Sequence, residues 1–284
     1  MSLVGCFFTP HPPIIVPEVG GAEVAKVEAT VQAMRRLGEA ATRLDPDTIV
    51  VMSPHALLAR SEMSVSIGSN YRGSFADFRA PQVRLDVPAD RELARLVVDR
   101  ATRDGIPIRL LGSPEDPIVL DHGTMVPLVY VTSGLKRGWR LLVLGFSYLD
   151  LETHVRFGKA LARAMEESPS RVLYIASGDL SHRLLPGAPA GYDPRGTEFD
   201  HAVADMFALA DWKGLLSLDQ GTVRAAGECG YRSLAVLAGV VQAMEAKGYV
   251  TGNDLFSYEG PFGVGYLVGE VTIVPAGVQQ GGAT

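Results

Sequence analysis

The sequence predicts an α/β fold: a single domain with a mostly parallel central sheet, flanked by helices and closed by an antiparallel edge near the C-terminus. Short apolar runs at 49–52, 140–146 and 172–176 are typical of strands buried on both faces of a parallel sheet. Between them, apolar residues recur at helical spacing at about 22–42, 91–103 and 150–167. Residues 251–274 read instead as two strands around Gly260-Pro-Phe-Gly263, which predicts the antiparallel edge.

The composition suits one large α/β domain, or at most two. The chain has 284 residues, of which 47% are hydrophobic and 20% charged, so it can bury a sizeable core. No break in composition marks a linker between domains. We therefore expect residues 1–275 to form one domain and residues 276–284 to be a disordered tail.

Charge and cysteine content exclude several classes of function. A formal net charge of −6 argues against nucleic acid as a partner, because a phosphate backbone calls for a basic face. No apolar run approaches the length of a membrane span, and the N-terminus lacks the pattern of a signal peptide. Cys6 and Cys229 are too few for a disulfide framework. We expect a cytoplasmic protein that acts away from membranes.

An aromatic-containing stretch, residues 68–88, separates two predicted elements. It places Tyr71, Phe75 and Phe78 among glycine, serine and charged residues, which predicts a long loop. Such loops often form lids or pocket walls in compact domains. The alternative is that the aromatic residues anchor the loop to the core, and the sequence favours neither reading.

Three predicted strands end in residues that can perform chemistry. Gly5–His11 and Ile49–His55 each run from an apolar strand into a hydroxyl residue, a proline and a histidine. Arg171–His182 runs from an apolar strand into Ser177-Gly178 and then delivers Asp179 and His182. In open α/β sheets, ligands bind at the carboxyl ends of the strands. If these strands are parallel neighbours, that edge is the active site.

His11 and His55 are the first candidates for metal binding. Neutral imidazole is the commonest metal ligand in proteins, and a core histidine would rarely repeat the same Pro-His context. Glu228 in Gly227-Glu-Cys-Gly230 is the best third ligand, because the start of a helix favours its ionised form. It could instead be a plain helix-start glutamate, and Cys229 is a softer competing ligand. Two histidines and a carboxylate suit either Fe(II) or a zinc hydrolase.

The remaining histidines divide into two groups. His122 and His182 are candidates for proton transfer, because the ordinary pKa of histidine lies near neutral pH. Asp179 lies three residues before His182 and could orient it or cap a turn. His154 and His201 lie inside predicted helices, and we expect both to be ordinary surface or hydrogen-bonded histidines.

Five motifs resemble, in order, those of the class III extradiol ring-cleaving dioxygenases. They are Thr9-Pro-His11, Ser53-Pro-His55, Asp121-His-Gly-Thr-Met-Val-Pro-Leu128, Ser177-Gly-Asp-Leu-Ser-His182 and Gly227-Glu228. The most similar pattern is that of the catalytic B-subunit family, which includes protocatechuate-cleaving enzymes, and the match runs from about residue 4 to 270.

The resemblance implies an Fe(II) enzyme with His11, His55 and Glu228 as metal ligands, His182 as the acid/base and His122 contacting substrate. It implies that O2 opens the ring of a catechol or an o-aminophenol. It also implies a homo-oligomer, and some family members need a small companion subunit to complete the pocket. The Memo proteins share the fold and much of the histidine pattern, and some use a cysteine as the last ligand. A Memo-like binding or signalling protein is therefore the main alternative, and a zinc hydrolase is another.

Overall fold

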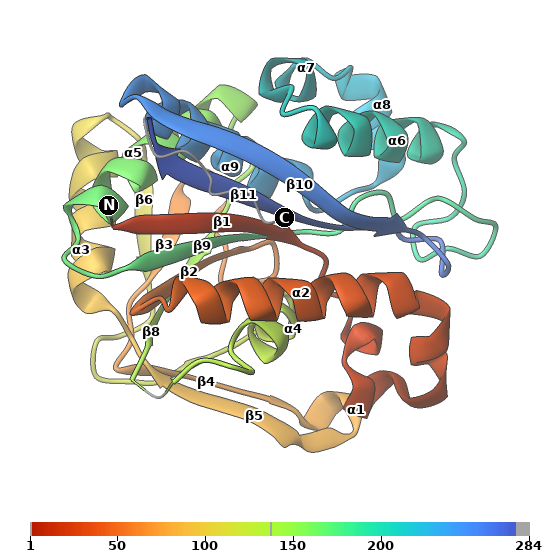
Figure 1. Ribbon diagram of the computed structural model, residues 1–284, viewed down its shortest axis with the longest axis horizontal. Helices are drawn as coiled ribbons and strands as arrows, with labels where there is room; N and C mark the ends of the chain where they lie inside the picture. Colours follow the sequence, from red (N-terminus) through yellow and green to blue (C-terminus); the bar gives the residue numbers. More distant parts are fainter. Residues whose placement is uncertain (1, 137, 277–284) are drawn as a thin grey trace, which may run out of the picture.

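The central element of the fold is an eight-stranded sheet with the strand order β10-β11-β1-β9-β2-β8-β3-β6. It is seen in a computed structural model that describes residues 2–136 and 138–276 (Figure 1). Its strands are β1 (Leu3–Thr9), β2 (Thr48–Ser53), β3 (Met63–Ser66), β6 (Ile108–Leu111), β8 (Arg140–Gly145), β9 (Val172–Ser177), β10 (Tyr249–Glu259) and β11 (Tyr266–Pro275).

Parallel pairing at the middle of this sheet is the feature that positions the site. β9 pairs in parallel with both β1 and β2, and β2 pairs in parallel with β8. The hairpin β10–β11 pairs antiparallel with β1 at one edge, and β3 pairs antiparallel with β8 toward the other. The predicted fold class, including the antiparallel C-terminal edge, is confirmed.

Helices cover both faces of the sheet (Figure 1). The helices are α1 (Pro17–Gly20), α2 (Glu28–Leu44), α3 (Arg91–Arg103), α4 (His122–Val131), α5 (Leu151–Glu167), α6 (Arg195–Ala208), α7 (Trp212–Leu216), α8 (Gln220–Ala226) and α9 (Tyr231–Ala246). Two short 3₁₀ helices, η1 (Pro13–Ile15) and η2 (Gly21–Val27), precede α2.

Alternate strand residues build two separate cores. Phe7 packs with α2 and α4 on one face of the sheet, whereas Phe8 packs with α5 and α9 on the other. Side chains of a strand alternate between its faces, so a strand covered on both sides must be apolar throughout. This explains the continuous apolar runs from which the strands were predicted.

A small second sheet corrects the prediction for residues 68–88. In place of a loop, the structure has β4 (Asn70–Phe75), a 3₁₀ turn η3 (Ala76–Phe78) and β5 (Ala80–Pro88), paired with β7 (Ile118–Val119). Tyr71 and Phe75 are buried, and the Tyr71 hydroxyl donates to the Ser66 carbonyl at 3.2 Å. These two rings anchor the hairpin to the core, while polar residues occupy its solvent face. The hairpin lacks clear alternation along β5, which is why the pattern resembled a loop.

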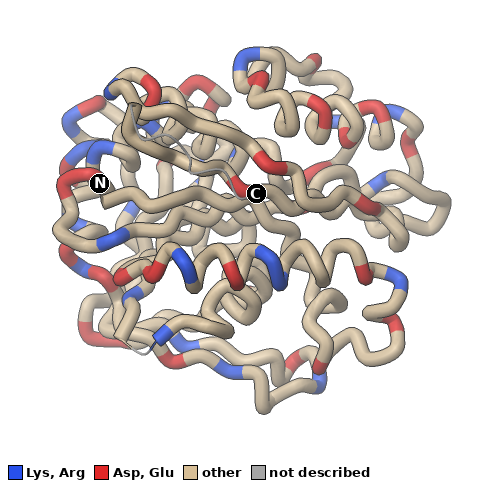
Figure 2. The backbone as a smooth tube through the Cα atoms, in the orientation of Figure 1, with Lys and Arg blue, Asp and Glu red and all other residues tan. Residues whose placement is uncertain are grey.

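Charged side chains are interspersed over the molecule. Acidic and basic residues occur together along α2 and around the outer helices (Figure 2). Within the described residues, no helix is both long and apolar enough to cross a membrane. The predicted tail lies almost wholly outside the described residues, which end at 276.

Candidate metal centre

The three strand ends identified in the sequence meet at one edge of the sheet. β9 lies between β1 and β2, and Ser177 at its end is in register with Thr9 of β1. The segments that follow these strands carry His11, His55 and Asp179. Parallel neighbours necessarily end at the same edge, so residues far apart in sequence converge there.

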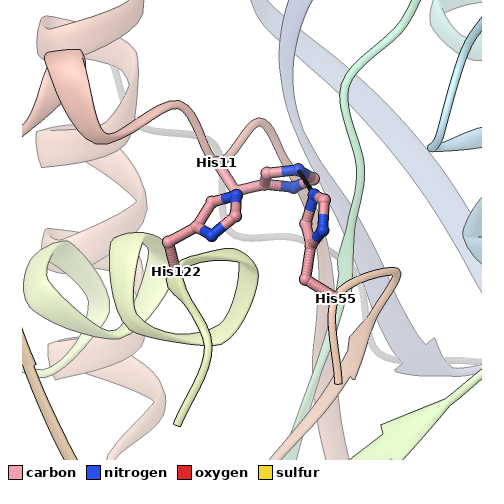
Figure 3. A group of neighbouring side chains, drawn as sticks. All are labelled: His11, His55 and His122. Atoms are coloured by element: carbon pink, nitrogen blue, oxygen red, sulfur yellow. Dashed lines mark hydrogen bonds between the residues drawn. The ribbon is translucent and has the colours of Figure 1, made fainter. Parts of the chain in front are cut away.

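Three histidine rings form the first cluster at this edge. The Nε2 atoms of His11 and His55 are 3.1 Å apart, and the ring of His122 lies 4.2 Å from that of His55 between centroids (Figure 3). One ring nitrogen from each of the three residues lies within 4.8 Å of the others. This spacing is close enough for the three residues to contact one ion or one small ligand.

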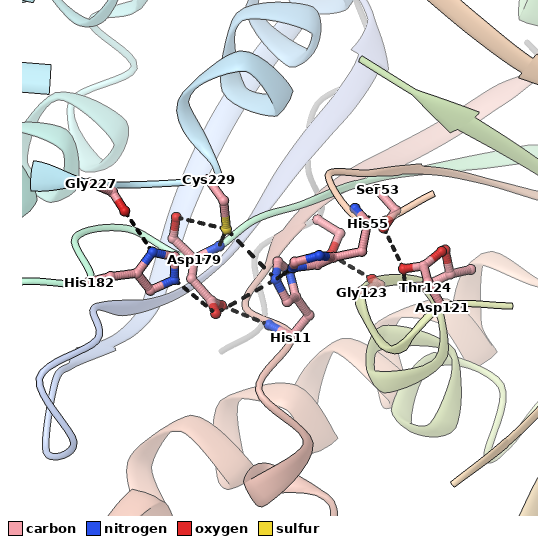
Figure 4. Close-up of polar contacts among 11 residues, drawn as sticks. His11, Ser53, His55, Asp121, Gly123, Thr124, Asp179, His182, Gly227 and Cys229 are labelled. Atoms are coloured by element: carbon pink, nitrogen blue, oxygen red, sulfur yellow. Dashed lines mark hydrogen bonds and ion pairs between the residues drawn. The ribbon is translucent and has the colours of Figure 1, made fainter. Parts of the chain in front are cut away.

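A second cluster shares His11 with the first. The Nε2 atom of His11 lies 3.6 Å from Asp179 Oδ2 and 3.7 Å from Cys229 Sγ (Figure 4). Ligand atoms bound to a single ion at about 2.0–2.3 Å lie roughly 3–4 Å apart. His11, Asp179 and Cys229 therefore have the spacing of a metal-binding set, and His11 links this set to His55 and His122.

Glu228, predicted as the third ligand, is in neither cluster among the described residues. Its Oε2 accepts a hydrogen bond of 2.6 Å from the Tyr231 backbone N–H, the first in α9. It lines a different cavity with Tyr148 and Arg232. The unsatisfied N–H groups at a helix start attract a carboxylate, and here they hold Glu228 on the side of the loop away from His11. The adjacent Cys229 points to the cluster in its place.

Hydrogen bonds fix which nitrogen of His11 faces the cluster. The Ser177 hydroxyl donates its only hydrogen to the Gly123 carbonyl at 2.6 Å. At 3.0 Å from His11 Nδ1, that hydroxyl must therefore accept, so Nδ1 carries the proton. The lone pair of His11 is then on Nε2, directed at His55, Asp179 and Cys229. Such an oriented imidazole is typical of metal-ligating histidines.

The charge states of the two facing histidines favour metal binding. Burial, together with the nearby His11 and His122, lowers the pKa of His55 to about 4. Burial also lowers the pKa of His11, against the opposing effect of Asp179. Both imidazoles are neutral near pH 7, as coordination requires.

His182 has the opposite electrostatic setting. Its Nδ1 donates to the Gly227 carbonyl at 2.7 Å, and its Nε2 lies 3.8 Å from Asp179 Oδ2 (Figure 4). Burial lowers the pKa of His182, but the attraction of Asp179 and the Gly227 carbonyl outweighs it, so the pKa is raised. Burial raises the pKa of Asp179, but His11 and His182 outweigh it, so the pKa is lowered. His182 is thus suited to hold a proton beside a charged Asp179.

The segment that carries His122 is tied directly to the end of β2. Asp121 accepts hydrogen bonds from the Thr124 backbone N–H at 2.9 Å and from the Ser53 hydroxyl at 2.7 Å. The first capped turn of α4 therefore sets the place of His122 relative to His55. A side chain at Gly123 would bring its Cβ within 2.6 Å of Ser53 Oγ, so only glycine fits this contact.

All five site residues that face inward line one cavity of about 530 Å³. These residues are His11, His55, His122, Asp179 and His182. Its other walls come from Pro12, Pro13, Ile14, Pro189, Phe262, Val264 and Tyr266. The volume lies in the range of small-molecule sites. Two titratable histidines, His122 and His182, thus face the same space as the candidate metal ligands.

A family model described as the catalytic LigB subunit of aromatic ring-opening dioxygenase matches residues 5–269. The chain belongs to this family. The resemblance predicted from the five motifs is thereby confirmed, and the matched residues contain all of them. LigB dioxygenases depend on a metal, and the clusters around His11 are the candidate place for it.

Individual relatives connect this LigB-family chain to several kinds of protein. It is 37% identical over 274 residues to Protein CA_C1420 of Clostridium acetobutylicum, covering 94% of this chain and 57% of that relative. It is 23% identical over 196 residues to the 3,4-dihydroxyphenylacetate 2,3-dioxygenase of Escherichia coli, covering 66% of this chain and 70% of that enzyme. It is 25% identical over 183 residues to a MEMO1 family protein of Methanosarcina mazei, covering 64% of each. The chain thus spans a little over half the length of the first of these relatives.

A solved structure shares the fold over nearly the whole chain. The uncharacterized protein JW3007 from Escherichia coli K12 superposes with a TM-score of 0.64 at 17% sequence identity. The superposition covers 95% of this chain and 99% of that one. At this identity the likeness bears on the fold alone.

Sequence reasoning missed the residues that support the LigB-family site. The sequence shows Ser177 and Ser53 only as parts of strand endings, whereas in the structure Ser177 orients His11 and Ser53 holds Asp121. The sequence pattern that could have indicated this role is the hydroxyl residue at the end of each of the three strands. His154 and His201 lie outside the cavity, as expected for histidines inside helices.

Proposed function

We propose that the protein is an Fe(II)-dependent extradiol dioxygenase that opens the ring of a catechol or an o-aminophenol with O2. The observation that carries this proposal is the set of metal-ligating atoms around His11 Nε2, placed at the floor of a cavity that two further histidines face. Membership of a family of aromatic ring-opening dioxygenases supports it independently.

We assign His11, His55 and Asp179 as the three metal ligands, with Cys229 as an adjacent donor. This set gives two neutral imidazoles and one ionised carboxylate, which is the facial triad of non-haem Fe(II) oxygenases. It replaces the set with Glu228, because the carboxylate of Glu228 is engaged at the start of α9. Iron(II), when bound, supplies the redox chemistry between the ring and O2.

The remaining groups of the cavity bind and move protons. His182 is held through Nδ1, which leaves Nε2 to exchange a proton with a ring hydroxyl. Asp179 stabilises the protonated form of His182 from 3.8 Å. His122, fixed at the start of α4, contacts the ring from the side next to His55. Two groups that hold the ring in place lower the entropy cost of the reaction.

Metal analysis and an activity assay on the same preparation test this proposal. Protein purified without oxygen should contain about one iron per chain and convert a catechol to a yellow ring-opened product when O2 is admitted. Zinc-loaded protein serves as the control and should bind the catechol without consuming O2. Stoichiometric iron with no turnover of any diol or aminophenol would refute the proposal.

A second function is supported by Cys229. Its thiol lies 3.7 Å from His11 Nε2, and relatives include MEMO1 family proteins. A Memo-like metal-binding protein without dioxygenase activity would use His11, His55 and Cys229 together with His182. In that case His182→Ala would lose its metal, whereas the dioxygenase assignment predicts that it keeps it.

A further inference from the structure

The cavity in front of the histidines has a polar floor and an apolar wall. The floor is the set of inward-facing histidines with Asp179. The wall beyond it is formed by Pro12, Pro13, Ile14, Pro189, Phe262 and Val264, and Tyr266 adds one hydroxyl. No lysine or arginine lines this cavity within the described part of the chain.

The space on the other side of His122 also lacks a basic residue. A cavity of about 240 Å³ there is lined by Phe75, Phe78, Asp77 and Asp121, among others. Its acidic side chains are Asp77 and Asp121, and no lysine or arginine lines it among the described residues. A ring substituent that extended past His122 would therefore meet negative charge and aromatic surface.

Two basic residues near the cavity, Lys26 and Arg183, do not line it. Lys26 lies over the Phe262 ring, 5.8 Å from its centroid, and pairs with Glu23 at 2.6 Å. Arg183 follows His182 in sequence, and its Nε is buried without a hydrogen-bond partner among the described residues.

These charges decide which ring substituents the cavity can accept. A carboxylate on the ring would lose its hydration on entry and meet no lysine or arginine on the cavity wall. An alkyl or aryl group would instead bury its surface against proline, isoleucine and phenylalanine.

We propose that the substrate is a catechol or aminophenol whose ring substituent is uncharged and apolar. This inference rests on the proposed function and adds the class of substrate to it. The apolar wall, in particular Ile14 and Phe262, then contacts the substituent, while His122 and His182 contact the ring and its hydroxyls.

Two ring compounds that differ in one group test the inference. Zinc-loaded protein is titrated by calorimetry with a methyl-substituted catechol and with the catechol that carries a carboxylate at the same ring position. The methyl compound should bind at least about tenfold more tightly, in line with the cost of an unpaired buried charge. Equal or tighter binding of the carboxylate would overturn the inference. If the protein holds metal and binds neither compound, the proposed function fails, and the inference falls with it.

A gain of function sharpens the same test. Ile14→Arg should tighten binding of the carboxylate compound by about tenfold to a hundredfold, because it supplies a charge-assisted hydrogen bond. The matched control, Ile14→Gln, should leave the preference for the methyl compound in place. Phe262→Arg provides a second variant at another half-buried wall position. Circular dichroism shows whether the two arginine variants fold. If both fold and neither binds the carboxylate compound more tightly than the wild type does, the wall does not contact the substituent and the inference is wrong.

Discussion

His11 and His154 are both buried, but their hydrogen bonds give them different roles. His154 Nδ1 donates to the Asp150 carbonyl at 2.8 Å, and its Nε2 accepts from the Ser147 backbone N–H at 3.4 Å. Both ring nitrogens are therefore satisfied by backbone. His11 Nδ1 is satisfied by Ser177, but its Nε2 faces only other ligand-type atoms.

The difference shows how a structural histidine is distinguished from a binding one. Burial alone does not separate them, because His11 is 2% exposed and His154 is fully buried. What separates them is the partner of the second ring nitrogen, which is a backbone N–H for His154 and a set of ligand-type side-chain atoms for His11. A lone pair that faces a carboxylate, a thiol and a second imidazole is costly unless a cation or a proton occupies the space between them.

The largest effect on metal content and activity is expected from removing a histidine that is a proposed metal ligand. His55→Ala should lose iron and dioxygenase activity together, because one of three protein ligands is gone. Metal content per chain and turnover are measured on the same preparation. Retained iron with lost activity would place His55 outside the ligand set.

His182→Ala should separate metal content from turnover. The variant should keep about wild-type iron while turnover falls by roughly 10²–10⁴-fold, the usual contribution of a positioned acid/base group. His182→Gln is the matched control for cavity volume and should behave in the same way. Loss of metal from both variants would support the Memo-like ligand set.

A smaller effect is expected at the residue that orients His11. Ser177→Ala removes the hydrogen-bond acceptor of His11 Nδ1, and metal affinity should fall by about 10–100-fold. Competition with a chelator of known affinity measures this change. Thr9→Ala at the end of β1 is a suitable control, because Thr9 Oγ1 has no hydrogen-bond partner among the described residues. Equal losses in the two variants would argue against an orienting role for Ser177.

The smallest effect on the site is expected from the structural histidine. His154→Leu should leave metal content unchanged but destabilise the fold by about 1–3 kcal/mol, because two backbone groups lose their partner. Burial lowers the pKa of His154, so the unfolded chain binds the proton more tightly than the folded one. The contribution of His154 to the free energy of unfolding of the wild type is therefore present above a pH of about 6.5 and is lost as the pH falls below that value. Denaturant titrations at several pH values should show a weaker pH dependence in His154→Leu; an unchanged pH dependence would contradict this account.

The sequence predicts the sheet edge better than it predicts the ligand set. Apolar strands that are followed by Pro-His or by Asp179 locate the edge, because neighbouring parallel strands have their carboxyl ends at the same edge of a sheet. It does not predict which of two adjacent residues, Glu228 or Cys229, faces the cluster. That choice depends on the left-handed backbone of Gly227, with φ of +63°, and on the first N–H of α9, which binds the carboxylate.

The sequence does not predict the hairpin at residues 70–88, for a related reason. Its strands pack on the core through only a few side chains, among them Tyr71 and Phe75, and present polar residues elsewhere. The pairing of β4 with β5 and β7 depends on these tertiary contacts rather than on an alternation of apolar and polar residues in the sequence.

Metal content in Asp179→Asn and Glu228→Gln tests the central claim most directly. The claim is that the carboxylate at the metal centre comes from Asp179 and that Glu228 serves the start of α9. Both substitutions keep the size of the side chain, and the glutamine oxygen can still accept from the Tyr231 N–H. Iron per chain, measured after anaerobic purification, should fall in Asp179→Asn and stay at the wild-type level in Glu228→Gln. Iron lost from Glu228→Gln and kept in Asp179→Asn would contradict the assignment and restore the ligand set implied by the sequence motifs.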